Sequence, residues 1–238
     1  MTPDTSRDPS RHVSDDLRSF GRKRGRKPSP RQERLLAERL PALRVDLAHC
    51  ASRPLTDLFP GPVREIWLEI GFGGAEHLIH QARTNLDVGL IGCEPFEDGV
   101  IKALTAIEEG GLHNVRLHDD DARPLVRSLP EASLSKVFVL FPDPWPKARH
   151  AKRRLVSGPF LDLLARVMRP GAELRVATDI PAYARTVLEA IIPHPAFVWT
   201  AAAPSDWRTP WPDWPGTRYE AKAFREGRRP IYLSVKRR

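Results

Sequence analysis

The sequence has very little cysteine and no long apolar run. Cys50 and Cys93 are its two cysteines in 238 residues, so a disulfide framework is not expected and a reducing cytoplasm is. No stretch approaches the roughly 18 apolar residues of a membrane-spanning helix, and we expect no secretory signal. No Cys/His cluster has the spacing of a structural zinc site. We therefore expect neither a membrane nor a metal partner.

Positive charge is what the sequence has in excess. Lys and Arg number 38 against 30 Asp and Glu, which gives a net charge of +8 and an isoelectric point near 9.9. This balance favours an anionic partner, with nucleic acid ahead of an anionic membrane surface. The length and the 41% hydrophobic content suit one sizeable α/β domain with an appendage, or two small domains. The protein is expected to be a monomer or a homodimer.

From residue 65 onward, predicted strands and helices alternate. Strands are expected at 65–70, 87–93, 114–118, 136–141, 172–178, 196–200 and 231–236, and helices at 74–83, 96–109, 122–129, 157–168 and 181–192. Residues 201–229, rich in Trp and Pro, are expected to be irregular. The alternation predicts an α/β fold: a doubly wound, seven-stranded, mostly parallel sheet with helices on both faces.

The N-terminal part differs in composition. Residues 1–16 are polar and expected to be disordered. Residues 18–27 hold six basic residues and one aromatic, which is typical of an arm that lies on phosphates or of a solvated basic tail. We therefore divide the chain into a basic, partly disordered arm with a short helix, residues 1–60, and a main domain, residues 61–238.

The most informative stretch follows the predicted strand at 136–141. Asp143 stands between Pro142 and Pro144, with Trp145 next, and five Lys or Arg residues follow within 147–154. Because proline fixes φ and cannot pair in a ladder, the aspartate is expected on a stiff loop at a strand end. A rigid carboxylate beside an aromatic ring and dense positive charge favours a site for a polyanion over a solvated turn.

The turn after the first strand indicates a cofactor. Gly71, Gly73 and Gly74 let a ligand approach main-chain N–H groups at a helix start. A dinucleotide fold would need a third glycine where Glu76 stands, and a carboxylate there disfavours a pyrophosphate. Glu69, at the strand end, suits a ligand with positive charge, such as the ammonium and sulfonium groups of S-adenosylmethionine.

Acidic residues also end the next two predicted strands. Glu94 lies 21 residues after Gly73, the spacing at which an acid binds ribose hydroxyls. One of Asp119, Asp120 and Asp121 is expected to bond the adenine amino group. Helix N-capping is the alternative for Glu94 and Asp121. The whole set favours S-adenosylmethionine over NAD.

Segments in order along the chain carry a family resemblance. They are Arg18-Ser19-Phe20 with Gly25-Arg26, residues 69–73, Gly92-Cys93-Glu94, Asp121-Ala122, residues 141–150 with Lys152-Arg153-Arg154, Ala177-Thr178-Asp179, and residues 217–220. In these the chain resembles the bacterial tRNA (guanine-N7)-methyltransferase family. The resemblance implies a class I methyltransferase fold, with residues 61–238 as that domain. It also implies methyl transfer from S-adenosylmethionine to N7 of the variable-loop guanine, position 46, of tRNA.

The resemblance also implies roles for single residues. Those implied for the cofactor are Glu69, Gly71, Gly73, Glu94, Asp121, Ala122 and Asp143, with Asp143 also catalytic. Those implied for the substrate nucleotide or the RNA are Lys147, Arg149, His150, Lys152, Arg153, Arg154, Asp179, Thr217, Arg218, Tyr219 and Glu220. Pro146 departs from the family pattern, because many relatives carry His or another polar residue there.

The chemistry of guanine limits what the site must do. N7 has an in-plane lone pair and no proton, so its attack on a methyl group needs no general base, only alignment. A fixed carboxylate that accepts hydrogen bonds from N1–H and the 2-amino group stabilises the growing positive charge, and Asp143 and Asp179 are the candidates. The alternatives are a methyltransferase for an amine or a DNA base, a non-catalytic RNA-binding protein and, third, an NAD dehydrogenase.

Overall fold

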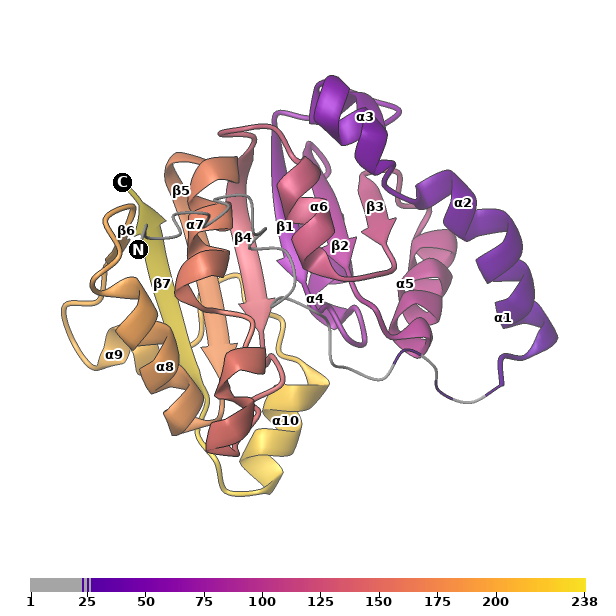
Figure 1. The fold of residues 1–238 in the computed structure, drawn as a ribbon. Coiled ribbons are helices and arrows are strands. Elements are labelled where there is room, and N and C mark those ends of the chain that lie inside the picture. The colour runs from indigo at the N-terminus through magenta and orange to yellow at the C-terminus, as the bar shows by residue number, and fades with distance from the viewer. Residues whose placement is uncertain (1–22, 24, 26) are drawn as a thin grey trace, which may run out of the picture.

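A seven-stranded sheet forms the centre of the molecule, in the order β3-β2-β1-β4-β5-β7-β6 (Figure 1). This computed structural model describes residues 23, 25 and 27–238, so the expectations for residues 1–16 and for most of the basic arm lie outside it. The strands are β1 (Glu65–Ile70), β2 (Val88–Cys93), β3 (Val115–His118), β4 (Leu134–Leu140), β5 (Met168–Thr178), β6 (Phe197–Trp199) and β7 (Ile231–Arg237). Strands β1 to β5 pair in parallel and β7 pairs antiparallel with β5 and β6.

Helices cover both faces of this sheet, as predicted. On one face α4 (Glu76–Thr84) and α5 (Glu97–Gly110) share a hydrophobic core with the sheet, and on the other α6 (Ala122–Ser128), α7 (Gly158–Val167) and α8 (Pro181–Ile191) do so. The α5 helix ends at Gly110, followed by Gly111 at φ +58°, the left-handed conformation that commonly ends a helix. The doubly wound α/β prediction is confirmed.

The start of β5 was predicted too late. The strand begins at Met168 and continues through Pro170 and Gly171, which we expected to separate the helix from the strand. Leu134 pairs with Met168 and Lys136 with Glu173, so the register shifts between the two pairs. An irregularity of this kind accommodates a proline that cannot donate to the ladder.

The segment 201–229 is not irregular throughout, which corrects the sequence prediction. It holds α9 (Ser205–Arg208) and α10 (Arg218–Arg225). Thr217 caps α10, its hydroxyl accepting a hydrogen bond from the Glu220 main-chain N–H at 3.2 Å. Thr followed three residues later by Glu is a start signal for a helix, and the surrounding Trp and Pro residues obscured it.

Residues 30–58 form short helices against the sheet: α1 (Pro30–Arg34), η1 (Leu35–Arg39), α2 (Leu40–Leu43), α3 (Leu47–Ser52) and η2 (Leu55–Leu58). Leu35 and Leu40 are buried in the core on the α5 side, and Cys50 and Leu55 in the core on the other. The Val45 N–H donates to the Leu117 carbonyl at 2.8 Å, next to β3. The domain boundary at residue 60 stays a prediction.

The described residues hold no helix with the length and apolar character needed to cross a bilayer. Nor do the side chains of that part of the chain form a group of three or more His, Cys, Asp or Glu suited to a metal ion. Cys50 and Cys93 are buried as free thiols. Burial raises the pKa of Cys50 to about 11 and that of Cys93 well above its usual value.

Candidate functional site

A cavity of about 440 Å³ opens at the carboxyl ends of β1, β2 and β4. Ligands of doubly wound folds bind at this edge of the sheet, because the loops that follow parallel strands meet there. Its wall includes these predicted site residues: Gly71, Gly73, Glu94, Asp121, Ala122, Asp143, Arg153, Arg218 and Tyr219. The structure thus brings together residues from the segments that follow β1, β2, β3 and β4, from η3 (Ala148–Arg153) and from α10.

Glu94 is fixed between two loops of this wall. Its Oε2 accepts a hydrogen bond from the Gly73 N–H at 2.8 Å, and its Oε1 accepts one from the Phe96 N–H at 2.9 Å. The N-cap residue of α5 is Phe96, so Glu94 is not the helix cap considered as its alternative. Burial raises the pKa of Glu94, and the charges of Asp143 and Glu69 add to the rise while the two main-chain bonds oppose it.

The glycine turn approaches α5 closely. Gly71 and Gly73 have φ values of +75° and +53°, which glycine adopts without strain. A side chain at Gly99 would collide with the carbonyl oxygen of Gly73. Our reading of the sequence missed Gly99, although an isolated glycine inside a predicted helix is a signal of such close approach. It also missed Phe96 and Lys102, which line the same wall.

The three consecutive aspartates have separate partners. Asp119 accepts two hydrogen bonds from Arg44, at 2.8 and 2.7 Å, and Asp120 forms an ion pair with Lys23 at 2.7 Å. Asp121 lies on the cavity wall instead. Of the three candidates, Asp121 is therefore the one placed to meet a ligand.

Asp121 also has a structural role within the chain. It is the N-cap of α6, where its Oδ1 accepts the Arg123 N–H at 2.8 Å and its Oδ2 pairs with Arg123 Nη1 at 2.8 Å. Capping and ligand binding are thus compatible at this position. Arg123 is buried, and its Nε has no hydrogen-bond partner within the described chain.

Glu69 lies beneath the wall and is absent from its lining. Successive side chains of a strand point to opposite faces of the sheet. Glu69 therefore points toward α4, whereas Ile70 points into the hydrophobic core on the face covered by α6, α7 and α8. The Glu69 carboxylate is 3% exposed, with Oε2 2.7 Å from His77 Nδ1 on α4. A direct contact of Glu69 with a cofactor stays a prediction.

The loop after β4 has the stiff, non-repetitive conformation that its prolines predict. Residues 142–146 belong to no helix or strand, and Asp143 is exposed where the loop meets the cavity. Phe141 and Trp145 have φ values of +49° and +41°, in the left-handed region that non-glycine residues rarely adopt. The Phe141 ring stacks on Tyr219 with centroids 6.4 Å apart.

Arg154, predicted to contact RNA, holds this loop in place. Its Nε donates to the Pro144 carbonyl at 3.0 Å and its Nη2 to the Trp145 carbonyl at 3.4 Å. Its Nη1 donates to the Thr186 hydroxyl on α8. Through its guanidinium, Arg154 thus joins the loop to α8. A contact of Arg154 with RNA stays a prediction.

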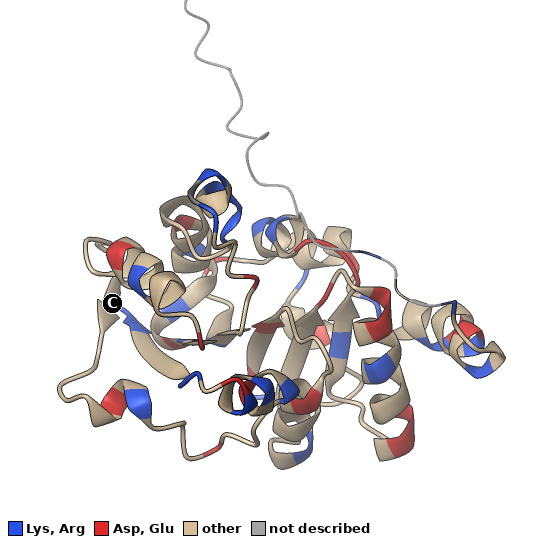
Figure 2. Cartoon of the chain, turned by 90° about the horizontal axis from the view of Figure 1, so that it is seen from below, with Lys and Arg blue, Asp and Glu red and all other residues tan. Residues whose placement is uncertain are grey.

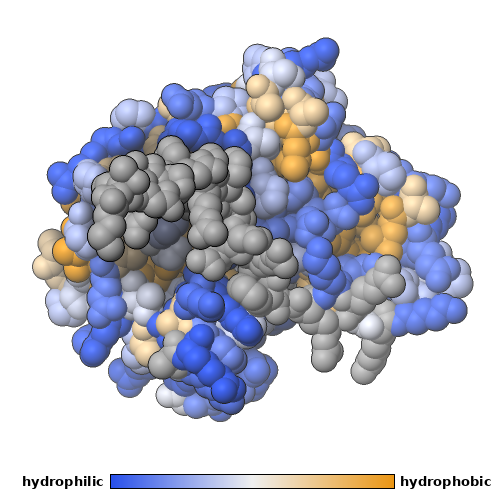
Figure 3. Space-filling view, in the orientation of Figure 1, coloured by the Kyte–Doolittle hydropathy of each residue, from blue (hydrophilic) through white to orange (hydrophobic). Residues whose placement is uncertain are grey.

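Three other basic residues of this segment face outward. The short helix η3 (Ala148–Arg153) and its flank expose Lys147, Arg149 and Lys152, and the Arg153 guanidinium lies 4.9 Å above the Trp145 ring. His150, half-buried, meets the same ring edge-on. Viewed toward the carboxyl ends of the strands, Lys and Arg lie on segments around the acidic centre (Figure 2), and the lower part of the molecule is largely hydrophilic (Figure 3).

Helix α10 covers the glycine turn. Arg218 forms an ion pair with Glu76, the residue that stands where a dinucleotide fold needs glycine. A Cβ on Gly73 would lie 2.9 Å from Tyr219 Cε2. Burial raises the pKa of Tyr219, with the charge of Glu94 adding to it. Residues of α10 therefore line the same cavity as the glycine turn that follows β1.

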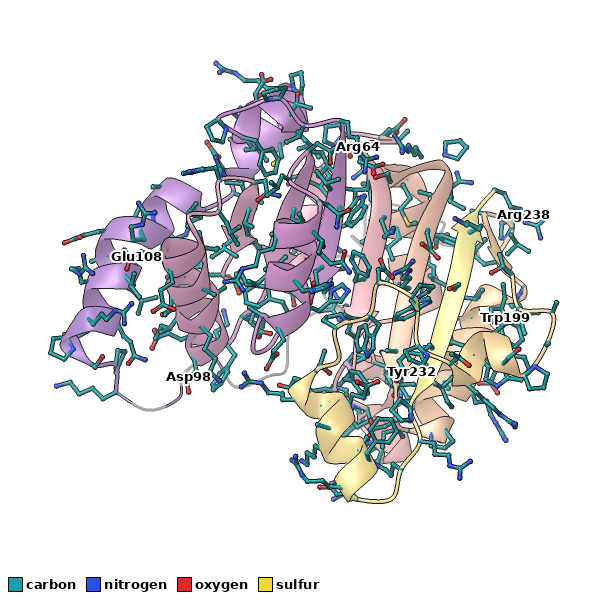
Figure 4. The ribbon with its side chains drawn as sticks, turned by 180° about the vertical axis from the view of Figure 1, so that it is seen from behind. Arg64, Asp98, Glu108, Trp199, Tyr232 and Arg238 are labelled. Atoms are coloured by element: carbon teal, nitrogen blue, oxygen red, sulfur yellow. The ribbon has the colours of Figure 1, made fainter. Side chains whose placement is uncertain are left out.

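Three residues predicted to bind substrate have partners within the chain. Thr217 caps α10, and Asp179 Oδ2 pairs with Arg228 Nε at 2.6 Å. The buried Glu220 accepts hydrogen bonds from Trp214 Nε1 at 2.9 Å and from the hydroxyl of Tyr232, which lies on β7 near α10 (Figure 4). Their roles in substrate binding stay predictions.

Comparison with known proteins agrees with this fold. A family model described as a putative methyltransferase matches residues 63–233. Two solved structures share the fold: the 16S rRNA methyltransferase KamB, with a TM-score of 0.52 and 19% identity over 74% of this chain and 88% of that one, and TrmN from Thermus thermophilus, with a TM-score of 0.52 and 18% identity over 77% and 47%.

Curated relatives are far more similar in sequence. A tRNA (guanine-N(7)-)-methyltransferase of Rhodospirillum rubrum is 49% identical over 94% of this chain and 89% of its own length. That of Hyphomonas neptunium is 53% identical over 87% and 93%. With about half of the residues identical over most of both chains, this protein belongs to the bacterial tRNA (guanine-N7)-methyltransferase family.

Proposed function

We propose that the protein transfers a methyl group from S-adenosylmethionine to N7 of the variable-loop guanine, position 46, of tRNA. The observation that carries the proposal is a single cavity that joins the glycine turn, Glu94, Asp121 and Asp143 beside the exposed cations of η3. The names of the curated relatives support the same reaction. A tRNA substrate places the reaction in the cytoplasm.

The wall of the cavity has the groups that S-adenosylmethionine requires. Glu94 is a buried, fixed acceptor suited to ribose hydroxyls, and Asp121 is suited to the adenine amino group. The turn at Gly71 and Gly73 gives the amino-acid portion close access to the main chain. The cofactor, when bound, supplies an electrophilic methyl group on its sulfonium.

Asp143 is the residue we assign to the guanine. Its exposed carboxylate on a stiff loop accepts hydrogen bonds from the N1–H and 2-amino edge, which strengthen as positive charge grows on the purine. No proton leaves N7, so this carboxylate orients and stabilises without acting as a base. Asp179, the second candidate, is held by Arg228 and is the less available of the two.

The cations of η3 and its flank are the proposed RNA surface. Lys147, Arg149 and Lys152 are exposed beside the cavity, where they would neutralise phosphates on either side of the target base. Phosphate contacts of this kind position the RNA without selecting a base. Base selection is then left to Asp143.

The proposal is tested by incubating the protein with labelled S-adenosylmethionine and an unmodified tRNA transcript, then identifying the nucleoside product by mass spectrometry. We expect 7-methylguanosine, and its loss when the variable-loop guanine is changed to adenine. A different methylated nucleoside would overturn the substrate assignment. tRNA binding with no methyl transfer would favour the non-catalytic alternative.

A further inference from the structure

A buried polar chain runs from β1 through α4 to the loop before α10. Glu69 Oε2 lies 2.7 Å from His77 Nδ1, and His77 Nε2 lies 3.2 Å from Gln81 Nε2. Gln81 Nε2 in turn donates to the Asp213 carbonyl at 3.2 Å. The exposed fractions of Glu69, His77 and Gln81 are 3%, 2% and 0%. Ordering three polar side chains in a core is costly unless every group is satisfied.

Main-chain carbonyls determine the direction of these hydrogen bonds. The Asp213 carbonyl only accepts, so the amide nitrogen of Gln81 must face it. The Gln81 oxygen accepts from Asn85 Nδ2 at 3.1 Å, and Asn85 Nδ2 is itself oriented by the Gln81 main-chain carbonyl at 3.0 Å. The second N–H of the Gln81 amide therefore donates to His77 Nε2.

The tautomer of His77 follows from this direction. Because Nε2 accepts, the ring proton is on Nδ1 and is donated to Glu69. The ring is also held by packing: its centroid lies 4.6 Å from that of Phe138 and 5.3 Å from that of Trp214. A neutral, fixed imidazole gives Glu69 one hydrogen bond and leaves its negative charge uncompensated by His77.

That charge lies beside the cavity. The next two residues, Ile70 and Gly71, line the wall, and the charge of Glu69 contributes to the raised pKa of Glu94, which burial dominates. In a low-dielectric interior a fixed charge acts strongly on a neighbouring ion. A negative charge here favours a sulfonium over its neutral thioether product.

We propose that His77 is a positioning residue, which holds the Glu69 carboxylate beneath the cofactor cavity and is locked by Gln81 in the tautomer that this requires. This inference rests on the proposed function in one respect: it takes the cavity as the binding site of S-adenosylmethionine. It makes His77 a determinant of the preference for the charged cofactor over S-adenosylhomocysteine.

Three variants of the full chain separate the parts of this account. His77→Phe keeps the ring packing and removes both hydrogen bonds, whereas His77→Asn keeps an N–H near the Nδ1 position. His80→Asn, one turn along the same helix and outside the polar chain, is the matched control. Titration calorimetry gives Kd for S-adenosylmethionine and S-adenosylhomocysteine, and ¹⁵N NMR of labelled histidine gives the tautomer.

We expect the wild-type His77 signal to report a neutral ring protonated at Nδ1. His77→Phe should weaken S-adenosylmethionine binding about tenfold, the size of one charge-assisted hydrogen bond, with a smaller effect on S-adenosylhomocysteine. His77→Asn should recover most of the loss, and His80→Asn should change neither affinity. A merely structural role for His77 would weaken both ligands equally.

Two results would overturn the proposal. One is a wild-type His77 protonated at Nε2 or at both nitrogens. The other is an unchanged ratio of the two affinities in a folded His77→Phe. If His77→Phe fails to fold, the wild-type NMR tautomer still decides. Failure of the wild-type protein to bind S-adenosylmethionine would instead refute the proposed function, and the tautomer measurement would stand apart from it.

Discussion

The acidic cavity and the basic segment around η3 lie side by side and are built in opposite ways. Glu94 is 8% exposed, and main-chain N–H groups of two loops fix both of its oxygens. Arg149 and Lys152 extend into solvent from a short helix. Fixed, desolvated groups recognise shape and charge at one point, whereas exposed cations attract a polyanion without selecting it. The proposed recognition of the cofactor and the proposed attraction of RNA thus fall to two differently built regions.

Arg154 shows that sequence position does not decide to which region a residue belongs. It follows Arg153 in one basic run, yet its guanidinium is hydrogen-bonded to the main chain of the Pro-Asp-Pro-Trp loop and to Thr186. Its partners make it part of the rigid region.

The largest effect is expected from Asp143→Asn. Loss of the carboxylate removes an interaction that strengthens in the transition state, so kcat should fall by about two to three orders of magnitude. Kd for tRNA should stay within about twofold, because phosphate contacts are intact. Steady-state methyl transfer and filter binding measure both, with Asp162→Asn on the exposed face of α7 as control. An unchanged kcat would remove Asp143 from the mechanism.

Glu94→Gln should weaken S-adenosylmethionine binding roughly thirtyfold, since an amide nitrogen would face one of the two N–H donors and an ionised acceptor is lost. The raised pKa of Glu94 also has a consequence for the wild type. Affinity should fall as the pH drops through this pKa, above the range of an ordinary carboxyl, because the protonated acid is the weaker acceptor. Calorimetry across acidic pH should show this limb in the wild type and not in Glu94→Gln.

Arg154→Ala should destabilise the protein by about 2 kcal/mol, because several hydrogen bonds to a half-buried cation are lost. kcat should fall with it, since the loop that presents Asp143 loses its attachment to α8. Thermal unfolding and methyl transfer measure the two effects. Weaker tRNA binding at unchanged stability and kcat would instead return Arg154 to the RNA-binding surface.

The combined Arg149→Ala and Lys152→Ala variant should have the smallest effect at physiological salt, about five- to tenfold in Kd for tRNA. The slope of log Kd against log salt should fall by roughly 1 to 2, since each neutralised phosphate contributes about 0.7 to 0.9. Stability and base choice should not change. An unchanged salt slope would show that these cations do not meet phosphates.

Much of this arrangement could be predicted because it depends on local signals. The apolar runs predicted all seven strands, although the start of β5 was predicted four residues too late, and β1 was predicted with its observed bounds, Glu65–Ile70. The acids that end β2 and β4 meet at one cavity because parallel strands end at the same edge. The cofactor could therefore be predicted from the acidic residues that gather at this edge.

What could not be predicted depends on partners distant in the sequence. Helix α10 was missed because its buried positions include the carboxylate of Glu220, whose donors, Trp214 and Tyr232, come from a loop and from β7. A helix that buries a charge shows no clear apolar period. The hydrogen bonds of Arg154 could not be predicted either, because two of their acceptors are main-chain carbonyls, which no sequence pattern marks.

The separation of recognition from attraction is tested most directly by measuring two affinities on two variants. Kd for S-adenosylmethionine and Kd for tRNA are determined for Glu94→Gln and for the Arg149→Ala and Lys152→Ala variant at one salt concentration. We predict that Glu94→Gln weakens the cofactor and leaves tRNA unchanged, and that the double variant does the reverse. If either variant weakens both ligands to a similar degree, the two regions do not act separately and the account is wrong.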